Sequence, residues 1–172
     1  HLAAMMEVRD IQKVTVYDQR REAAKKYQKE MEEKYKIPVM VCDSVEEAVK
    51  GAEIICTVTP SKEPYLKAEW ITPGAHINAV GAFTPNTREI ESSLMAKAKL
   101  YADQVEAMKK ECGEYLIPKN EGLFGEEHIT GSIGGILAGQ VPGRENDTEI
   151  TLFDALGLAV EDVACGRFLC RE

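Results

Sequence analysis

The sequence of 172 residues has no long hydrophobic run, which argues against a membrane-spanning function. A helix that crosses a bilayer needs roughly 18 or more consecutive apolar residues. The apolar stretches of this sequence are all much shorter, and none has the pattern of a secretory signal peptide. We therefore expect no membrane partner.

Signals for disulfide pairing are also missing. The five cysteines are an odd number, and no two of them have the CxxC spacing. Cys42 and Cys56 lie in apolar runs, where a free thiol behaves as a small buried hydrophobic group. We expect free thiols in a reducing cytoplasm rather than a disulfide framework.

Histidine is scarce, and nucleophile motifs are absent. His1, His76 and His128 are far apart and lack the spacing to Cys or Asp that a metal site needs. His76 lies inside an apolar run, which favours a hydrogen-bonded structural residue. The sequence has no GxSxG elbow. It therefore predicts neither a metal centre nor covalent hydrolysis, and it leaves the catalytic residues unassigned.

The charge balance is acidic, with 21 Lys and Arg against 29 Asp and Glu and a net charge of −8. Such a chain repels phosphate backbones, so we expect no nucleic-acid partner. Small anionic ligands remain compatible with this charge, because backbone amides and helix ends bind anions locally.

Short runs of β-branched and apolar residues alternate with amphipathic stretches. The runs predict strands at residues 14–17, 37–42, 54–58, 75–80, 99–102 and 150–153. Helices are expected at residues 1–7, 20–35, 104–112, 132–138 and 155–170. Two further helices are suggested by their caps: one begins with Ser44 and Glu47 and ends at Gly51, and another begins with Asn86 and Glu89 and reaches residue 97. Residues 118–127 are expected to be irregular.

This alternation predicts an α/β fold with a doubly wound, Rossmann-like parallel sheet, truncated at its N-terminus. The glycine-rich GxGxxG loop should precede a helix such as residues 1–8, and the sequence does not contain it. In the strand order 3-2-1-4-5-6 the strand before that loop is central. We therefore expect residues 1–172 to be an incomplete dinucleotide-binding domain. Its strands at 14–17 and 54–58 should not pair with each other.

Asp18 directly follows the first predicted strand. In dinucleotide-binding folds an acidic residue there accepts hydrogen bonds from the adenosine ribose hydroxyls, and it disfavours a 2′-phosphate. The alternative is a cap for the helix that begins near residue 20. Arg20 and Arg21 leave NADP open as well as NAD, because a nearby arginine accommodates the extra phosphate.

Two other predicted strands end in segments suited to ligand binding. Thr59 begins the turn after the strand at 54–58, and Val80, Gly81 and Ala82 end the strand at 75–80. Open α/β sheets bind ligands at the carboxyl ends of their strands, and small residues let a flat ring approach the backbone. The alternative in both places is an ordinary turn.

Four segments together resemble the ornithine cyclodeaminase/mu-crystallin family, over nearly the whole chain and in the same order. They are AEIICTVTPS (52–61), PGAHINAVGA (73–82), ECGE (111–114) and TLFDALGLAVED (151–162). The resemblance implies a Rossmann domain that binds NAD or NADP. It also implies a separate N-terminal domain that holds the substrate carboxylate and forms a homodimer. The C-terminal helix at 155–170 would return toward that domain.

The resemblance also assigns roles to residues. Asp18 would bind the adenosine ribose, Thr59 would lie along the cofactor, and Ala79, Val80, Gly81 and Ala82 would line the nicotinamide side. The chemistry that members share is hydride transfer between the nicotinamide and the α-carbon of an amino or imino acid. The substrate is therefore expected to be a small amino or cyclic imino acid.

Two positions depart from the cyclodeaminase pattern. Phe83 stands where cyclodeaminases carry an aspartate that acts on the substrate amine, and Ala155 stands where they carry serine. Phenylalanine can neither exchange a proton nor pair with an ammonium group. The sequence therefore favours an NAD-dependent amino-acid dehydrogenase or imine reductase. Two alternatives stay open: ornithine cyclodeaminase and a non-catalytic, crystallin-like cofactor-binding protein.

Overall fold

The computed structural model describes residues 1–170 and divides the chain into two compact units, His1–Ala52 and Glu53–Glu172. Each unit carries a parallel sheet, with two strands in the first unit and five in the second. Parallel strands with helical crossovers are what the alternating sequence pattern predicts, so the α/β class is confirmed.

The first unit contains α1 (Leu2–Val8), β1 (Val14–Val16), α2 (Arg21–Tyr35), β2 (Val39–Val41) and α3 (Val45–Val49). Side chains of α2 satisfy the backbone of β2: Gln28 donates to the Val39 carbonyl, and Glu32 accepts from the Val39 amide at 3.1 Å. Ser44 caps α3 as expected by accepting from the Glu47 amide at 3.1 Å.

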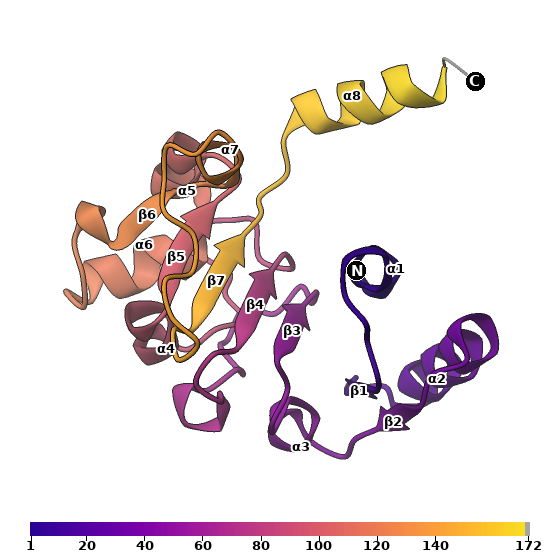
Figure 1. Ribbon diagram of the computed structural model, residues 1–172. Helices are drawn as coiled ribbons and strands as arrows, with labels where there is room; N and C mark the ends of the chain where they lie inside the picture. Colours follow the sequence, from indigo (N-terminus) through magenta and orange to yellow (C-terminus); the bar gives the residue numbers. More distant parts are fainter. Residues whose placement is uncertain (171–172) are drawn as a thin grey trace. The chain divides into compact units, whose positions relative to one another are not determined.

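The second unit begins with β3 (Ile54–Thr57), η1 (Ala68–Trp70), β4 (His76–Ala79), α4 (Ser92–Lys97), β5 (Lys99–Ala102) and α5 (Val105–Glu111). It continues with α6 (Gly113–Asn120), η2 (Glu126–His128), β6 (Ile129–Ser132), α7 (Ile133–Leu137), β7 (Thr151–Asp154) and α8 (Ala159–Leu169). Its strands lie in the order β3-β4-β7-β5-β6 and point the same way (Figure 1).

The core of the second unit is built on the middle of its sheet. Ile77, Leu152 and Leu100 stand opposite one another on β4, β7 and β5, and each is fully buried. Burying such a side chain contributes roughly 1.5–3 kcal/mol. Leu94 and Met95 of α4 and Met108 of α5 are also fully buried.

The position of β7 corrects the expected strand order. The 3-2-1-4-5-6 order would place residues 99–102 beside residues 75–80, but β7 lies between β4 and β5 and pairs with both. The physical reason is burial: Leu152 and Asp154 are both 0% exposed, which suits a central strand rather than an edge strand. The expectation for the strands at 14–17 and 54–58 is confirmed, because β1 and β3 belong to different sheets.

Four local expectations were wrong. Glu89 does not cap α4, which begins at Ser92 with Glu91 as its N-cap residue. Residues expected to be irregular contribute to α6, where buried Tyr115 outweighs the helix-breaking tendency of Pro118. The short strand β6 was not predicted from the sequence. Finally, α8 begins at Ala159 rather than at residue 155.

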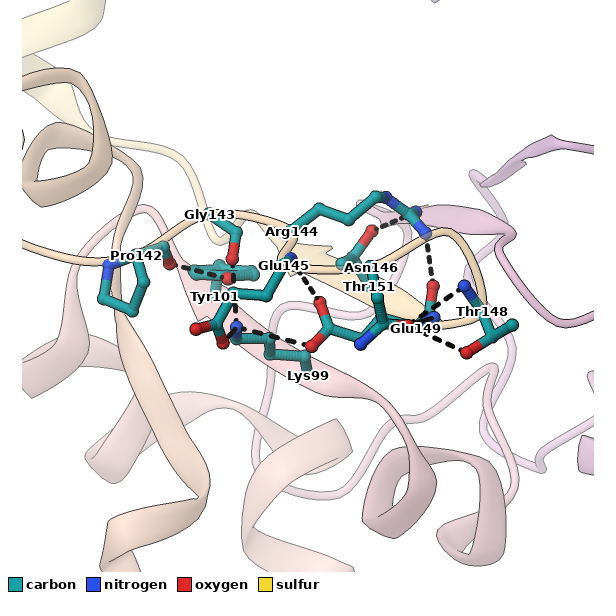
Figure 2. A network of polar contacts seen from close by, with 10 residues as sticks. All are labelled: Lys99, Tyr101, Pro142, Gly143, Arg144, Glu145, Asn146, Thr148, Glu149 and Thr151. Atoms are coloured by element: carbon teal, nitrogen blue, oxygen red, sulfur yellow. Dashed lines mark hydrogen bonds and ion pairs between the residues drawn. The ribbon is translucent and has the colours of Figure 1, made fainter.

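A polar network closes the amino ends of β4, β7 and β5 (Figure 2). The Arg144 guanidinium donates to the Thr151 hydroxyl at 2.9 Å and to the Ala75 carbonyl at 3.3 Å. Lys99 donates to the Gly143 carbonyl at 2.9 Å and pairs with Glu145 and, at 3.7 Å, with Glu149. The loop at residues 142–149 is therefore fastened across this edge of the sheet.

Two further contacts belong to the same edge. His76 Nδ1 lies 2.8 Å from the Thr151 hydroxyl, which confirms the structural role expected for this histidine. A side-chain carbon added at Gly74 would lie 2.3 Å from the Asp147 carbonyl oxygen, so the loop packs directly on a glycine. Polar groups at the amino edge are thus engaged with one another, which leaves the carboxyl edge as the place to look for a ligand site.

Candidate functional site

The carboxyl ends of β3 and β4 lie side by side, and the segments that leave them form the candidate site. Thr57 stands opposite Ala79, and the Val80 amide donates to the Thr57 carbonyl at 3.0 Å. A side-chain carbon added at Gly81 would lie 2.2 Å from the Thr59 carbonyl oxygen and 2.3 Å from its nitrogen. Only glycine allows this approach, so Gly81 brings the two segments into contact.

Glu89 joins these two segments through its carboxylate. One oxygen, Oε1, accepts from the Thr59 amide at 2.6 Å, from the Thr59 hydroxyl at 2.7 Å and from the Tyr65 hydroxyl at 2.7 Å. The other oxygen, Oε2, accepts from the Gly81 amide at 3.0 Å. Glu89 is 0% exposed, so these donors replace water around a buried acid.

The backbone around Glu89 is fixed as firmly as its side chain. The Glu89 carbonyl accepts from the amides of Tyr65 and Leu66 at 2.8 and 2.9 Å. The Glu114 carboxylate accepts from the amides of Glu89 and Ile90 at 2.5 and 3.2 Å. Burial raises the pKa of Glu114 to about 8, although these two amide donors oppose the rise. A second buried acid therefore anchors the first.

Tyr65 is held as a neutral hydrogen-bond donor. Burial raises the pKa of its hydroxyl well above the ordinary value, and the neighbouring Glu89 carboxyl adds to that rise. The hydroxyl lies 3.3 Å from that of Thr59 as well as 2.7 Å from Glu89. The side chains of Thr59, Tyr65 and Glu89 thus form a compact hydrogen-bonded group at the carboxyl edge of the sheet.

Two more acids stand at the ends of β5 and β7. Asp103 accepts from the amides of Leu156 and Gly157, both at 2.8 Å, and this ties the segment after β7 to the end of β5. Asp154 accepts from the Cys112 thiol at 3.3 Å, while its other oxygen, Oδ1, is buried without a hydrogen-bond partner among the described residues. Burial raises the pKa of Asp154 to about 7.

The structure brings five of the six predicted cofactor residues together. Thr59 lies against Gly81 where β3 and β4 end, and Ala79, Val80 and Ala82 are the chain neighbours of Gly81 in the same segment. Thr59, Val80 and Gly81 are partly exposed, whereas Ala79 and Ala82 are 2% and 3% exposed. The side chains of these two alanines therefore belong to the core, and the accessible groups here come from Thr59, Val80 and Gly81.

Asp18, the sixth predicted residue, lies in the first unit, two residues after β1. Its Oδ1 accepts from the Arg20 amide at 2.7 Å and lies 3.8 Å from the Arg20 guanidinium. The N-cap position of α2 is Arg20, so Asp18 supports the turn before the helix rather than capping it. Its side chain is 39% exposed, which leaves the carboxylate open to a ligand.

Sequence reasoning missed most of the buried acids. Asp103 and Asp154 stand at strand ends, a position that could have marked them. Glu89 and Glu114 carry no such signal, because their partners come from segments up to 30 residues away. Among residues 1–170, no group of three or more His, Cys, Asp or Glu side chains has the arrangement of a metal site. In the same range, no helix is long and apolar enough to cross a membrane.

Comparison with known proteins decides the family. The sequence profile of the ornithine cyclodeaminase/mu-crystallin family matches residues 1–171. The chain belongs to the ornithine cyclodeaminase/mu-crystallin family. The resemblance carried by the four sequence segments is therefore confirmed.

Relatives within the family include oxidoreductases. The chain is 39% identical to an alanine dehydrogenase of Archaeoglobus fulgidus, over 96% of this chain and 50% of that protein. It is 40% identical to a Δ1-pyrroline-2-carboxylate reductase of Bacillus cereus, over 96% of this chain and 51% of that protein. The chain thus spans about half the length of the curated relatives it matches.

A solved structure agrees with the fold. The chain superposes on Δ1-pyrroline-2-carboxylate reductase of Thermococcus litoralis, solved with NADH and L-proline, with a TM-score of 0.94 and 40% identity. The match covers 96% of this chain and 51% of that one. The Rossmann-like fold is therefore shared with a family member that binds a dinucleotide.

Within this family, Phe83 is an informative position. It directly follows the buried Ala82 at the end of the β4 segment, and it is 63% exposed. An exposed phenylalanine at this edge offers an apolar surface and no proton. Ala155, the second departure, follows β7, where its amide donates to the Ala79 carbonyl at 3.0 Å.

Proposed function

We propose that the protein is an NAD(P)(H)-dependent oxidoreductase of small amino or cyclic imino acids, either an amino-acid dehydrogenase or an imine reductase. The observation that carries the proposal is the carboxyl edge of β3 and β4. There the Glu89 carboxylate and the missing side chain of Gly81 hold Thr59 and the Val80–Gly81 backbone together in partly exposed positions. Relatives with about 40% identity that carry out such reactions support it.

Each unit carries groups of a kind that suits one part of a dinucleotide. The half-exposed Asp18 carboxylate would accept hydrogen bonds from the adenosine ribose hydroxyls, since its Oδ1 alone is engaged by Arg20. Thr59, Val80 and Gly81 would hold the nicotinamide half, because a ring can approach a backbone that lacks a side chain. When bound, the cofactor supplies or accepts a hydride at its nicotinamide ring.

Phe83 bears on which type of reaction the protein catalyses. Cyclodeamination needs a group that manages the proton of a substrate amine, and an exposed phenyl ring offers none. The same ring would exclude water from the reacting carbon and favour an apolar ring or side chain on the substrate. We therefore place imine reduction or amino-acid oxidation ahead of ornithine cyclodeamination for this chain.

We further propose that residues 1–172 form most of a dinucleotide-binding domain, and that the residues holding the substrate carboxylate lie outside them. The share of the relatives' length that the chain covers supports this division. A homodimer is part of the same proposal, supported by the family resemblance. We also propose a cytoplasmic location, because all five cysteines are free and reducing compartments preserve thiols.

Cofactor binding and turnover, measured on the full-length protein, test the proposal. NADH fluorescence should report saturable binding, and NADH absorbance should fall when a cyclic imino acid, or a keto acid with ammonia, is added. Binding without turnover of any such substrate would favour the non-catalytic alternative. Absence of NADH and NADPH binding would refute the proposal altogether.

A further inference from the structure

Glu89 occupies a position that the proposed reaction does not by itself explain. It is a fully buried acid outside the parts expected to touch cofactor or substrate, yet its two oxygens bond to both segments that are expected to do so. Oε1 fixes residue 59 after β3, and Oε2 fixes residue 81 after β4. One carboxylate therefore joins the two segments beyond the last backbone hydrogen bond between them, that of the Val80 amide to the Thr57 carbonyl.

We propose that Glu89 is a positioning residue for the nicotinamide end of the cofactor, acting through Thr59 and Gly81. The inference rests on the proposed function. It adds that Glu89 fixes the positions of Thr59 and Gly81 without itself contacting the cofactor.

Three features make the carboxylate a fixed spacer. The backbone of Glu89 is held at its amide by Glu114 and at its carbonyl by two amides of the 65–66 segment. Tyr65 adds a third donor to Oε1 at 2.7 Å, which limits rotation of the carboxylate. The Glu89 carboxylate can approach residue 81 because that residue is glycine: a side-chain carbon added there would lie 2.6 Å from Glu89 Oε1. These contacts together restrict the orientation of the Glu89 side chain.

The hydrogen bonds of Glu89 predict what a substitution at this position would do. Both oxygens face N–H or O–H donors, so both must be acceptors. Glu89→Gln keeps the size of the side chain but places an amide donor against either the Gly81 amide or the Thr59 donors. One segment then moves away from the other, while the buried shape is largely preserved.

Glu91→Gln provides a matched control in the same segment. Glu91 also accepts from a backbone amide, that of Ala68 at 3.2 Å, and from the Ser93 hydroxyl at 2.9 Å. These partners lie away from residues 59 and 81, and the substitution chemistry is the same. Any general effect of losing an acid in this segment should appear in both variants.

The experiment is titration of the full-length wild type, Glu89→Gln and Glu91→Gln with NADH, with dissociation constant and binding stoichiometry determined separately. We expect Glu89→Gln to bind one NADH per chain with a dissociation constant raised about tenfold or more, and a matching rise in KM for NADH. Glu91→Gln should match the wild type. Lower stoichiometry with an unchanged dissociation constant would mean that Glu89 only supports folding, and would overturn the inference.

Tyr65→Phe covers the case in which Glu89→Gln does not fold. It removes one donor to Oε1 without burying a new polar group, and it should weaken NADH binding by a smaller factor at full stoichiometry. If Glu89→Gln does not fold and the folded Tyr65→Phe variant binds NADH with an unchanged dissociation constant, the inference is also overturned. If the wild type itself binds no NADH, the proposed function fails instead.

Discussion

Asp18, Asp103 and Asp154 each stand at or just after the end of a strand, but their surroundings differ. Asp18 is 39% exposed at its side chain, whereas Asp103 and Asp154 are 7% and 0% exposed. Asp103 bonds to three backbone amides, and Asp154 has a single thiol donor. The same residue type therefore has an exposed carboxylate in one place, holds a loop in another and is a buried acid in the third.

Asp18 should set the choice of cofactor. A carboxylate facing the ribose repels a 2′-phosphate, so we expect NAD(H) to bind at least about tenfold more tightly than NADP(H). Calorimetric titration of the full-length protein with both cofactors measures the ratio, and Asp18→Asn should reduce it. Equal affinities would contradict this prediction and would point to Arg20 or Arg21 as the partner of the 2′-phosphate.

Asp154 should make stability depend on pH. Burial raises the pKa of Asp154 from 3.8 to about 7. Between these two values the carboxyl is protonated in the folded state and ionised in the unfolded state. Its stabilising contribution is therefore complete below about pH 4 and is lost as the pH rises through about 7, at about 1.4 kcal/mol per unit of pKa difference. Asp154→Asn cannot ionise, so its free energy of unfolding relative to the wild type should rise between pH 5 and pH 8.

Urea unfolding across this pH range measures the effect, with Asp147→Asn as the control. Asp147 is exposed, so its substitution should shift the curve little and by the same amount at each pH. If the free energy of unfolding of Asp154→Asn changed with pH in the same way as that of the wild type, Asp154 would not be the source of the pH dependence.

The two edges of the five-stranded sheet differ in what their loops do. At the amino edge, the loop at residues 142–149 bonds to the first residues of β5 and β7 and to the residue before β4 (Figure 2). At the carboxyl edge, buried acids hold segments that stay partly exposed. The contacts that fasten the loop and the proposed ligand site thus lie at opposite ends of the same strands.

Arg144→Ala tests this division between the edges. It removes the donor to the Thr151 hydroxyl and to the Ala75 carbonyl, so we expect a loss of about 1–3 kcal/mol in the free energy of unfolding. The KM for NADH should stay unchanged, because the contacts lie at the far edge. The exposed Lys110→Ala should leave stability almost unaltered. A raised KM in Arg144→Ala would show that the two edges are coupled.

The sequence was most informative where local pattern and structure agree. Apolar runs located β3, β4, β5 and β7, and the turn residues after β3 and β4 marked the candidate site. The position of β7 between β4 and β5 was not predictable, because strand order depends on packing between distant segments. Glu89 was read as a helix cap for the same reason: its partners lie 30 and 8 residues away along the chain.

At the scale of the whole molecule, the proposed redox chemistry is supported by family membership. The reductase and dehydrogenase relatives are 39–40% identical. Phe83 supports the same proposal, because a phenyl ring lacks the proton chemistry that cyclodeamination needs.

Product analysis of two parallel reactions of the full-length protein tests this claim most directly. One reaction contains NADH and a five-membered cyclic imino acid, and the other contains NAD and ornithine. We predict net oxidation of NADH with formation of the cyclic amino acid in the first, at about 1–10³ turnovers per second. We predict neither ammonia nor proline above background in the second. Proline and ammonia from ornithine with no net change in cofactor, and an inactive first reaction, would contradict the account.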